Sequence, residues 1–210
     1  MRVQERQSSA RSLVAAGLLA LLVMAVLGVI VAGHHGAVVL DAPGSPIIEL
    51  FAGHRTSAVV LTELGGPETI GLLVAALAVV LLVRGRRRAA ALVVLAPAAA
   101  GALTEFLLKP LIDRPLGASP AFPSGHATAT WALASAVVLL LAGSGWPRRV
   151  RLVDSAVVVG IAAVNSVALV GGQYHLFTDV VGGAGVGIGV SCLVAAAVGV
   201  GRQAPAAQCR

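Results

Sequence analysis

The chain has 210 residues, of which 58% are hydrophobic and 11% are charged. Soluble globular domains carry about 25% charged residues, so this composition excludes that class and favours a protein whose solvent is a lipid bilayer. The formal net charge of +6 does not indicate nucleic-acid binding, because only 3% of the residues are aromatic and the arginines flank apolar runs instead of forming one basic face.

Six apolar runs follow one another along the chain. The first, at 13–32, is long enough to cross the hydrocarbon core as a helix and longer than the apolar part of a signal peptide. The other five fall at 68–83, 89–108, 127–142, 152–171 and 180–200. They predict an all-α integral membrane protein with six transmembrane helices, in which residues 12–201 form one membrane domain and residues 1–11 and 202–210 form short tails.

The arginines lie on alternate connections between these runs, as expected if cytoplasmic loops collect Lys and Arg. One set of connections contains Arg2, Arg6, Arg11, Arg84, Arg86, Arg87, Arg88, Arg148, Arg149, Arg151, Arg202 and Arg210. The other set, at 34–67, 109–125 and 172–179, contains only Arg55, Lys109 and Arg114. This asymmetry predicts that both termini are cytoplasmic and that the second set faces the extracytoplasmic side of the cell membrane.

The first outer connection, 34–67, contains prolines and glycines on both sides of an amphipathic stretch at 47–61. Proline and glycine punctuate helices, and an amphipathic helix can lie in the membrane interface with its apolar side toward the lipid. The sequence therefore predicts a short interfacial helix in this connection.

The other two outer connections contain residues that suit phosphate chemistry. A phosphoryl group needs cations and N–H donors around its oxygens, a nucleophile in line with the leaving oxygen, and an acid that protonates that oxygen. Residues 109–126 read K-P-L-I-D-R-P-L-G-A-S-P-A-F-P-S-G-H, and residues 171–179 read G-G-Q-Y-H-L-F-T-D. The first of these segments supplies two cations, Arg114 and Lys109, which is the only lysine of the chain.

The same two segments contain a helix start and two histidines. Ser124 fits the N-cap position of the fourth helix, whose free N–H groups can face an anion, and Gly125 lets the backbone approach a ligand closely. His175 and Asp179 are four residues apart, so the carboxylate can accept a ring N–H and leave the other ring nitrogen free to attack phosphorus. The pattern predicts a site built around His126 and His175.

The segments P-S-G-H at 123–126 and H-L-F-T-D at 175–179 resemble the second and third motifs of the type 2 phosphatidic acid phosphatase superfamily. The resemblance implies a six-helix membrane phosphatase that needs no metal or cofactor. Its expected substrate is a lipid phosphate monoester or diphosphate, and its other expected contacts are membrane lipids.

The resemblance also implies roles for individual residues. His175 is expected to become phosphorylated, His126 to protonate the leaving group, and Asp179 to orient His175. Phosphate binding is assigned to Lys109, Arg114, Ser124 and Gly125.

This sequence departs from the family pattern at two places. The family usually has six residues between the lysine and the arginine of its first motif, whereas four separate Lys109 from Arg114. It also usually has an arginine six positions before the third-motif histidine, where this chain has Leu169. Arg55, the one other outer cation, is therefore a candidate for the missing phosphate ligand, unless Gln173 or the backbone of Gly171 and Gly172 donates instead.

Two other classes of function stay open. A phospholipid-binding protein that has lost turnover would accommodate Leu169, and a transporter would use titratable groups within the membrane. For transport, however, the spans offer little beyond Glu105 and Asp154, and Glu105 is expected to pair with Lys109. The motifs are compatible with prenyl and glycerolipid phosphates alike, and with any oligomeric state.

Several other residues have a simpler structural interpretation. The histidines His34, His35 and His54 are expected to be wetted interfacial residues, and the glycines between 182 and 189 to allow close helix packing. Cys192 lies in an apolar run and Cys209 in the polar tail, which argues against a disulfide or a cysteine metal site.

Overall fold

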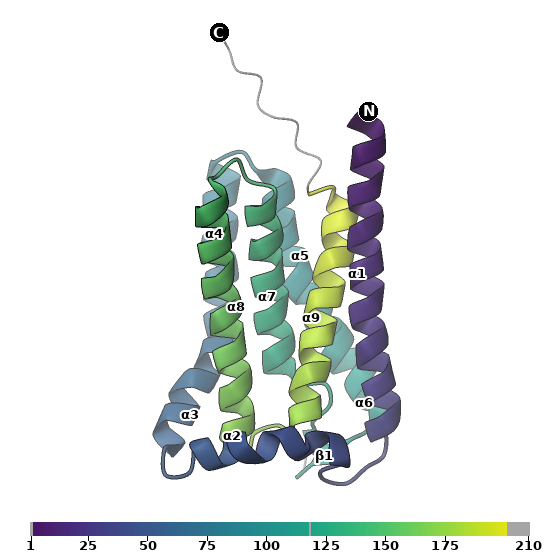
Figure 1. Ribbon diagram of the computed structural model, residues 1–210, viewed down its shortest axis with the longest axis vertical. Coiled ribbons are helices and arrows are strands. Elements are labelled where there is room, and N and C mark those ends of the chain that lie inside the picture. The colour runs from purple at the N-terminus through teal and green to yellow at the C-terminus, as the bar shows by residue number, and fades with distance from the viewer. Residues whose placement is uncertain (1, 118, 201–210) are drawn as a thin grey trace.

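The computed structural model describes residues 2–117 and 119–200, with side chains from residue 10 onward. Its helices and strands in chain order are α1 (Arg2–Val31), η1 (Val39–Gly44), α2 (Ser45–Leu50), α3 (Arg55–Thr62), η2 (Glu63–Gly65), α4 (Pro67–Val83), α5 (Arg87–Leu103), η3 (Thr104–Leu108), α6 (Lys109–Ile112), β1 (Pro115–Leu116), β2 (Ser119–Pro120), α7 (Gly125–Ala142), α8 (Arg148–Gly171) and α9 (Phe177–Val198). The long helices form one bundle (Figure 1). In the described part of the chain, the fold is all-α apart from the short β1–β2 hairpin.

Within residues 2–117 and 119–200, six segments are long and apolar enough to cross a membrane, which confirms the predicted number. They are Ala10–Val31, Arg55–Val83, Arg87–Ile112, Gly125–Ala142, Arg148–Gly171 and Phe177–Val198. Helices suit this environment because every backbone N–H and C=O within the hydrocarbon must find its partner in the chain itself. The predicted tail at 202–210, with Cys209, lies outside the described residues.

The connections between the spans alternate between the two ends of the bundle. The α4–α5 and α7–α8 connections lie at the end where α1 begins, and α2 and β1 lie at the opposite end (Figure 1). The first end carries the arginines of both connections, including Arg84, Arg86 and Arg148. This alternation is what the topology prediction requires, and the side of the membrane on which each end lies stays a prediction.

Helix α9 packs between α1 and α7 through its glycines. A Cβ atom on Gly183 would lie 2.5 Å from the carbonyl oxygen of Ser124, and one on Gly187 would lie 2.6 Å from that of Thr128, so α7 approaches the backbone of α9 directly. Toward α1, a Cβ atom on Gly189 would lie 2.7 Å from the side chain of Leu21. These contacts confirm the close helix packing that the glycine pattern predicts.

The first outer connection differs from its prediction. The single helix expected at 47–61 is two helices, α2 and α3, separated at 51–54, where Gly53 has a φ of +80°. Helix α2 lies across the end of the bundle, whereas α3 leads into η2 and α4 within the second span (Figure 1). Glycine adopts this left-handed conformation without strain, so the chain turns at a point that the amphipathic period does not reveal.

The third span extends beyond its predicted end at residue 108. Helix α5 continues through the π-helical turn η3 into the short α6, which ends at Asp113 in a left-handed conformation with a φ of 47°. The β1–β2 hairpin follows, and the fully buried ring of Phe122 then packs into the core beside Gly182 of α9. This packing fixes the start of α7 against α9.

Candidate active site

A cavity of about 540 Å³ lies at the end of the bundle that carries the predicted outer connections. It is lined by Gly65, Pro67, Gly101, Glu105, Lys109, Leu116, Ser119, Pro120, Ala121, Gly125, His126, Ala129, Tyr174 and His175. The two histidines come from the start of α7 and from the α8–α9 connection, and Lys109 comes from α6. The structure therefore brings both histidines, Lys109 and Gly125 into one cavity.

The start of α7 has the geometry of a capped helix. Ser124 is extended, with a φ of −65° and a ψ of 122°, and its Oγ accepts a hydrogen bond from the N–H of Ala127 at 3.4 Å. This confirms the predicted N-cap, although the buried Ser124 side chain does not line the cavity. Gly125 and His126 do, so the cavity meets the end of the helix where unpaired N–H groups favour an anion.

The two segments that carry the histidines are joined directly to neighbouring helices. The backbone N–H of Ser124 donates to the carbonyl oxygen of Asp179 at 2.9 Å, which fixes the start of α7 against the start of α9. The backbone N–H of His175 donates to the carbonyl of Leu169 at 3.2 Å, so the segment that carries this histidine is held on the end of α8. Both histidines are thus positioned by backbone contacts.

The carboxylate of Asp179 faces the ring of His175. Its Oδ2 lies 3.8 Å from Nδ1 of His175 and accepts a hydrogen bond from the backbone N–H of Leu176 at 3.0 Å. The separation of 3.8 Å is longer than a hydrogen bond, and Nδ1 makes no other hydrogen bond to the residues that the structure describes. Asp179 and His175, the predicted partners, are therefore adjacent. Asp179 faces Nδ1 of the ring and not Nε2.

Lys109 forms the ion pair that the sequence predicts. Its Nζ donates to both carboxylate oxygens of Glu105, at 2.7 and 2.9 Å, across one turn of the η3–α6 segment. A Cβ atom on Gly125 would lie 2.6 Å from Oε1 of Glu105, so the absence of a side chain at 125 lets this pair sit against the start of α7. The side chains of Lys109 and Glu105 are 18% and 47% exposed, and both line the cavity.

The histidines, Lys109 and the start of α7 all lie within a segment that matches a known family: residues 105–202 match the model of the PAP2 superfamily. This confirms the family that the two motifs resemble.

A solved structure has the same fold as this chain. It is the crystal structure of the first transmembrane PAP2-type phosphatidylglycerolphosphate phosphatase from Bacillus subtilis, with a TM-score of 0.70 and 18% sequence identity over 85% of this chain and 94% of that one. No curated protein sequence matches the chain. The similarity shows that this chain has the fold of a multi-pass PAP2 membrane phosphatase.

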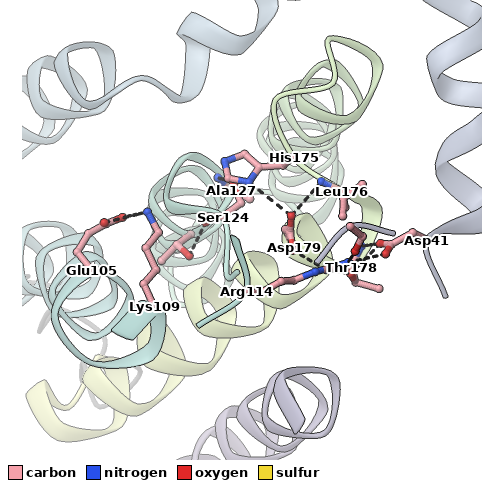
Figure 2. A network of polar contacts seen from close by, with 12 residues as sticks. Asp41, Glu105, Lys109, Arg114, Ser124, Ala127, His175, Leu176, Thr178 and Asp179 are labelled. Atoms are coloured by element: carbon pink, nitrogen blue, oxygen red, sulfur yellow. Dashed lines mark hydrogen bonds and ion pairs between the residues drawn. The ribbon is translucent and has the colours of Figure 1, made fainter. Parts of the chain in front are cut away.

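Arg114 does not line the cavity that holds the histidines, although the resemblance implies a phosphate contact for it. The side chain is fully buried. Its Nη1 donates to Oδ1 of Asp179 at 2.7 Å and to Oγ1 of Thr178, and its Nη2 donates to Oδ2 of Asp41 at 2.7 Å and to the carbonyl of Gly36 at 3.0 Å. In Figure 2, Asp179 lies between His175 and Arg114. Both terminal nitrogens of Arg114 are therefore committed to partners inside the protein.

Asp41 is the residue of this network that sequence reasoning misses. It lies in η1, before the segment that matches the PAP2 superfamily, and the one cue in the sequence is an aspartate set among apolar residues in A-V-V-L-D-A-P-G. Burial acts to raise the pKa of Asp41, but hydrogen bonds from Thr178, Val38 and Arg114 outweigh it, so that the pKa is lowered. The ionised carboxyl therefore stabilises the fold above the ordinary value of 3.8, and this stabilisation is lost as the pH falls through the lowered pKa.

Arg55 and Leu169 do not enter the cavity that holds the histidines. Arg55 is exposed and lines a second cavity of about 530 Å³ with Phe51 and Gln173, and Tyr174 lines both cavities. Leu169 is 1% exposed and packs in an apolar cluster with residues that include Ala127. The structure thus does not place Arg55 in the cavity where it would replace the phosphate-binding arginine that the family has at position 169.

Proposed function

We propose that this protein is a lipid phosphatase that hydrolyses a phosphate monoester or diphosphate of a prenyl lipid or glycerolipid through a phosphohistidine intermediate. One observation carries the proposal: His126, His175, Lys109 and the start of α7 line the same cavity. These groups supply a nucleophile, a proton donor, a cation and helix N–H groups, which together meet the needs of phosphoryl transfer.

In the first displacement, Nε2 of neutral His175 bonds to phosphorus while the bond from phosphorus to the lipid oxygen breaks. His126 gives its proton to that oxygen, so the lipid leaves as an alcohol or a monophosphate. Asp179 faces Nδ1 of His175 at 3.8 Å, where it favours the tautomer that leaves Nε2 unprotonated and stabilises the positive ring that forms.

In the second displacement, water attacks phosphorus and His126 takes the proton of that water. The bond between phosphorus and nitrogen breaks, inorganic phosphate leaves, and His175 returns to its neutral form. His175 carries the phosphoryl group and His126 transfers the proton in both steps, and the proposed reaction uses no metal and no cofactor.

Lys109 and the N–H groups at the start of α7 hold the phosphate in this proposal. Lys109 would exchange the carboxylate of Glu105 for phosphate oxygens, and Gly125 leaves room for them beside the helix end. Ser124 contributes by capping α7, which keeps these N–H groups directed at the cavity.

The test is phosphate release from lipid phosphates by purified protein in detergent or vesicles. His175→Ala should abolish release, and a chelator added to the wild-type protein should leave it unchanged. His34→Ala is the matched control, because His34 is exposed and lies outside the cavity. Full activity of His175→Ala would disprove the mechanism.

A panel of lipid phosphates in the same assay would identify the substrate class. The cavity is proposed to open to the extracytoplasmic side, where the predicted topology places its connections. A substrate added only to the outer leaflet of oriented vesicles should then be hydrolysed, and one confined to the inner leaflet should not.

A lipid-phosphate-binding protein without turnover is the second candidate. The low positive charge of the cavity wall favours this candidate, because Lys109 is the only Lys or Arg among the described lining residues. Binding of a lipid phosphate by the wild-type protein without any release of inorganic phosphate, over the same lipid panel, would select this candidate.

A further inference from the structure

The connection between α1 and α2 supplies a carboxylate to the start of α9. Asp41 Oδ1 accepts hydrogen bonds from the backbone N–H of Thr178 at 2.9 Å and from its hydroxyl at 2.7 Å. Its Oδ2 accepts from the backbone N–H of Val38 at 2.9 Å and from Arg114 at 2.7 Å. The side chain is 3% exposed, so all four bonds form away from solvent.

Arg114 lies between this carboxylate and that of Asp179. Its two terminal nitrogens contact the two carboxylates at the same distance, 2.7 Å, and neither carboxylate is more than 3% exposed. One buried cation is thus shared by two anions, which leaves the group with a net charge of about −1 while both carboxyls are ionised.

This shared cation determines how strongly Asp179 can act on His175. Asp179 uses Oδ1 for Arg114, whereas its Oδ2 faces His175 Nδ1 (Figure 2). If Asp41 carried no charge, the whole guanidinium charge would be balanced by Asp179, and less of the carboxylate charge would act on the imidazole. Asp41 would also no longer hold the guanidinium and Thr178 at the start of α9.

We propose that Asp41 is a positioning residue for the phosphatase reaction. It acts through Arg114 and Thr178 to hold Asp179 in place and to keep its charge directed at His175. This inference rests on the proposed function, and Asp41 itself does not line the cavity or touch the substrate. In this proposal Arg114 supports the position of His175 through Asp179 and does not bind phosphate.

The experiment compares Asp41→Asn with Asp113→Asn in the full-length protein. Asp113 is an exposed aspartate next to Arg114 in sequence, and its left-handed backbone suits asparagine. The rate is divided by the amount of folded, monodisperse protein measured by size-exclusion chromatography in detergent, so that unfolded protein does not count.

Asp41→Asn should lower the rate per active site roughly 10- to 100-fold, the range found for groups that orient metal-binding histidines through a second contact. KM should stay within about twofold of the wild-type value, because the lining of the cavity is unchanged. Asp113→Asn should match the wild type in both constants.

A second measurement separates positioning from a purely structural role. In an Asp179→Asn background, Asp41→Asn should lower the rate by no more than about twofold, because the effects of two substitutions that act through one contact are not additive. The same 10- to 100-fold loss in both backgrounds would overturn the proposal, as would an unchanged rate of Asp41→Asn in the wild-type background.

A milder variant covers the case in which Asp41→Asn does not fold. Thr178→Val removes the hydroxyl that bridges Asp41 and Arg114 and keeps the backbone bond to Asp41. It should lower the rate per active site in the same direction with KM unchanged, and a wild-type rate would overturn the proposal. If the wild-type protein released no phosphate from any lipid, the proposed function would fail instead.

Discussion

Two clusters of cations and carboxylates lie near the histidines, and they differ in burial. In the first, the side chains of Lys109 and Glu105 are 18% and 47% exposed and line the cavity. In the second, Arg114 is fully buried between Asp41 and Asp179, which are 3% and 0% exposed. The first-motif pattern assigns both cations to phosphate, whereas in the structure Lys109 lines the cavity and Arg114 does not.

This difference in burial determines how much each cluster contributes to the free energy of unfolding. An exposed ion pair contributes about 0–1 kcal/mol, so Lys109 can exchange Glu105 for a phosphate oxygen at little cost. Removing one partner of a buried pair costs about 3–5 kcal/mol, because the remaining charge is left without a counter-ion or water. One cation therefore lies at the cavity, and the other supports the structure around Asp179 and His175.

The largest expected effect is that of Arg114→Met, which leaves the carboxylates of Asp41 and Asp179 buried without their cation. We expect a loss of about 3–5 kcal/mol in the free energy of unfolding and no measurable phosphatase activity. Denaturation in detergent micelles measures the first quantity. Arg84→Met, which removes an exposed arginine at the other end of the bundle, is the control. If both variants were equally stable, Arg114 would not have the structural role described.

Lys109→Ala should have a smaller effect, and on activity instead of stability. The free energy of unfolding should change by no more than about 1 kcal/mol, because an exposed pair is lost. The turnover number should fall about 10²- to 10³-fold, as when one donor to a developing negative charge is removed. Glu105→Gln keeps the cation and removes the pair, so it should retain most of the activity. Equal losses in the two variants would mean that the pair, and not the lysine, is what catalysis needs.

Arg55→Ala should have the smallest effect. Arg55 lines the second cavity and not the one that holds the histidines, so its removal should change turnover by about twofold or less. Thr56→Ala, a change at an exposed neighbour, should behave alike in the same phosphate-release assay. A large loss of turnover that occurs only in Arg55→Ala would indicate that Arg55 binds phosphate.

The fold was predictable to the extent that it depends on the bilayer. Hydrocarbon requires long apolar helices, so six spans could be counted from the sequence alone. The break of the expected helix at 47–61 was not predicted, because one left-handed glycine, Gly53, redirects the chain without changing the hydrophobic pattern.

The candidate site was predictable where it depends on near neighbours. The Ser124 cap and the Lys109–Glu105 pair involve residues three and four positions apart, and both are present. The environment of Arg114 was not predictable in this way, because its partner Asp41 is 73 residues away and the two meet only through the packing of the first connection on α9. A motif identifies a residue type, and tertiary packing determines what that residue contacts.

Lys109 also allows selective chemical modification of the cavity. It is the only lysine of the chain, so an amine-selective reagent has only this side chain and the α-amino group to modify. Because its Nζ lies within the cavity wall and is bound to Glu105, its rate of modification depends on what occupies the cavity. Protection of this single amine by different lipid phosphates would rank their affinities without any turnover being measured.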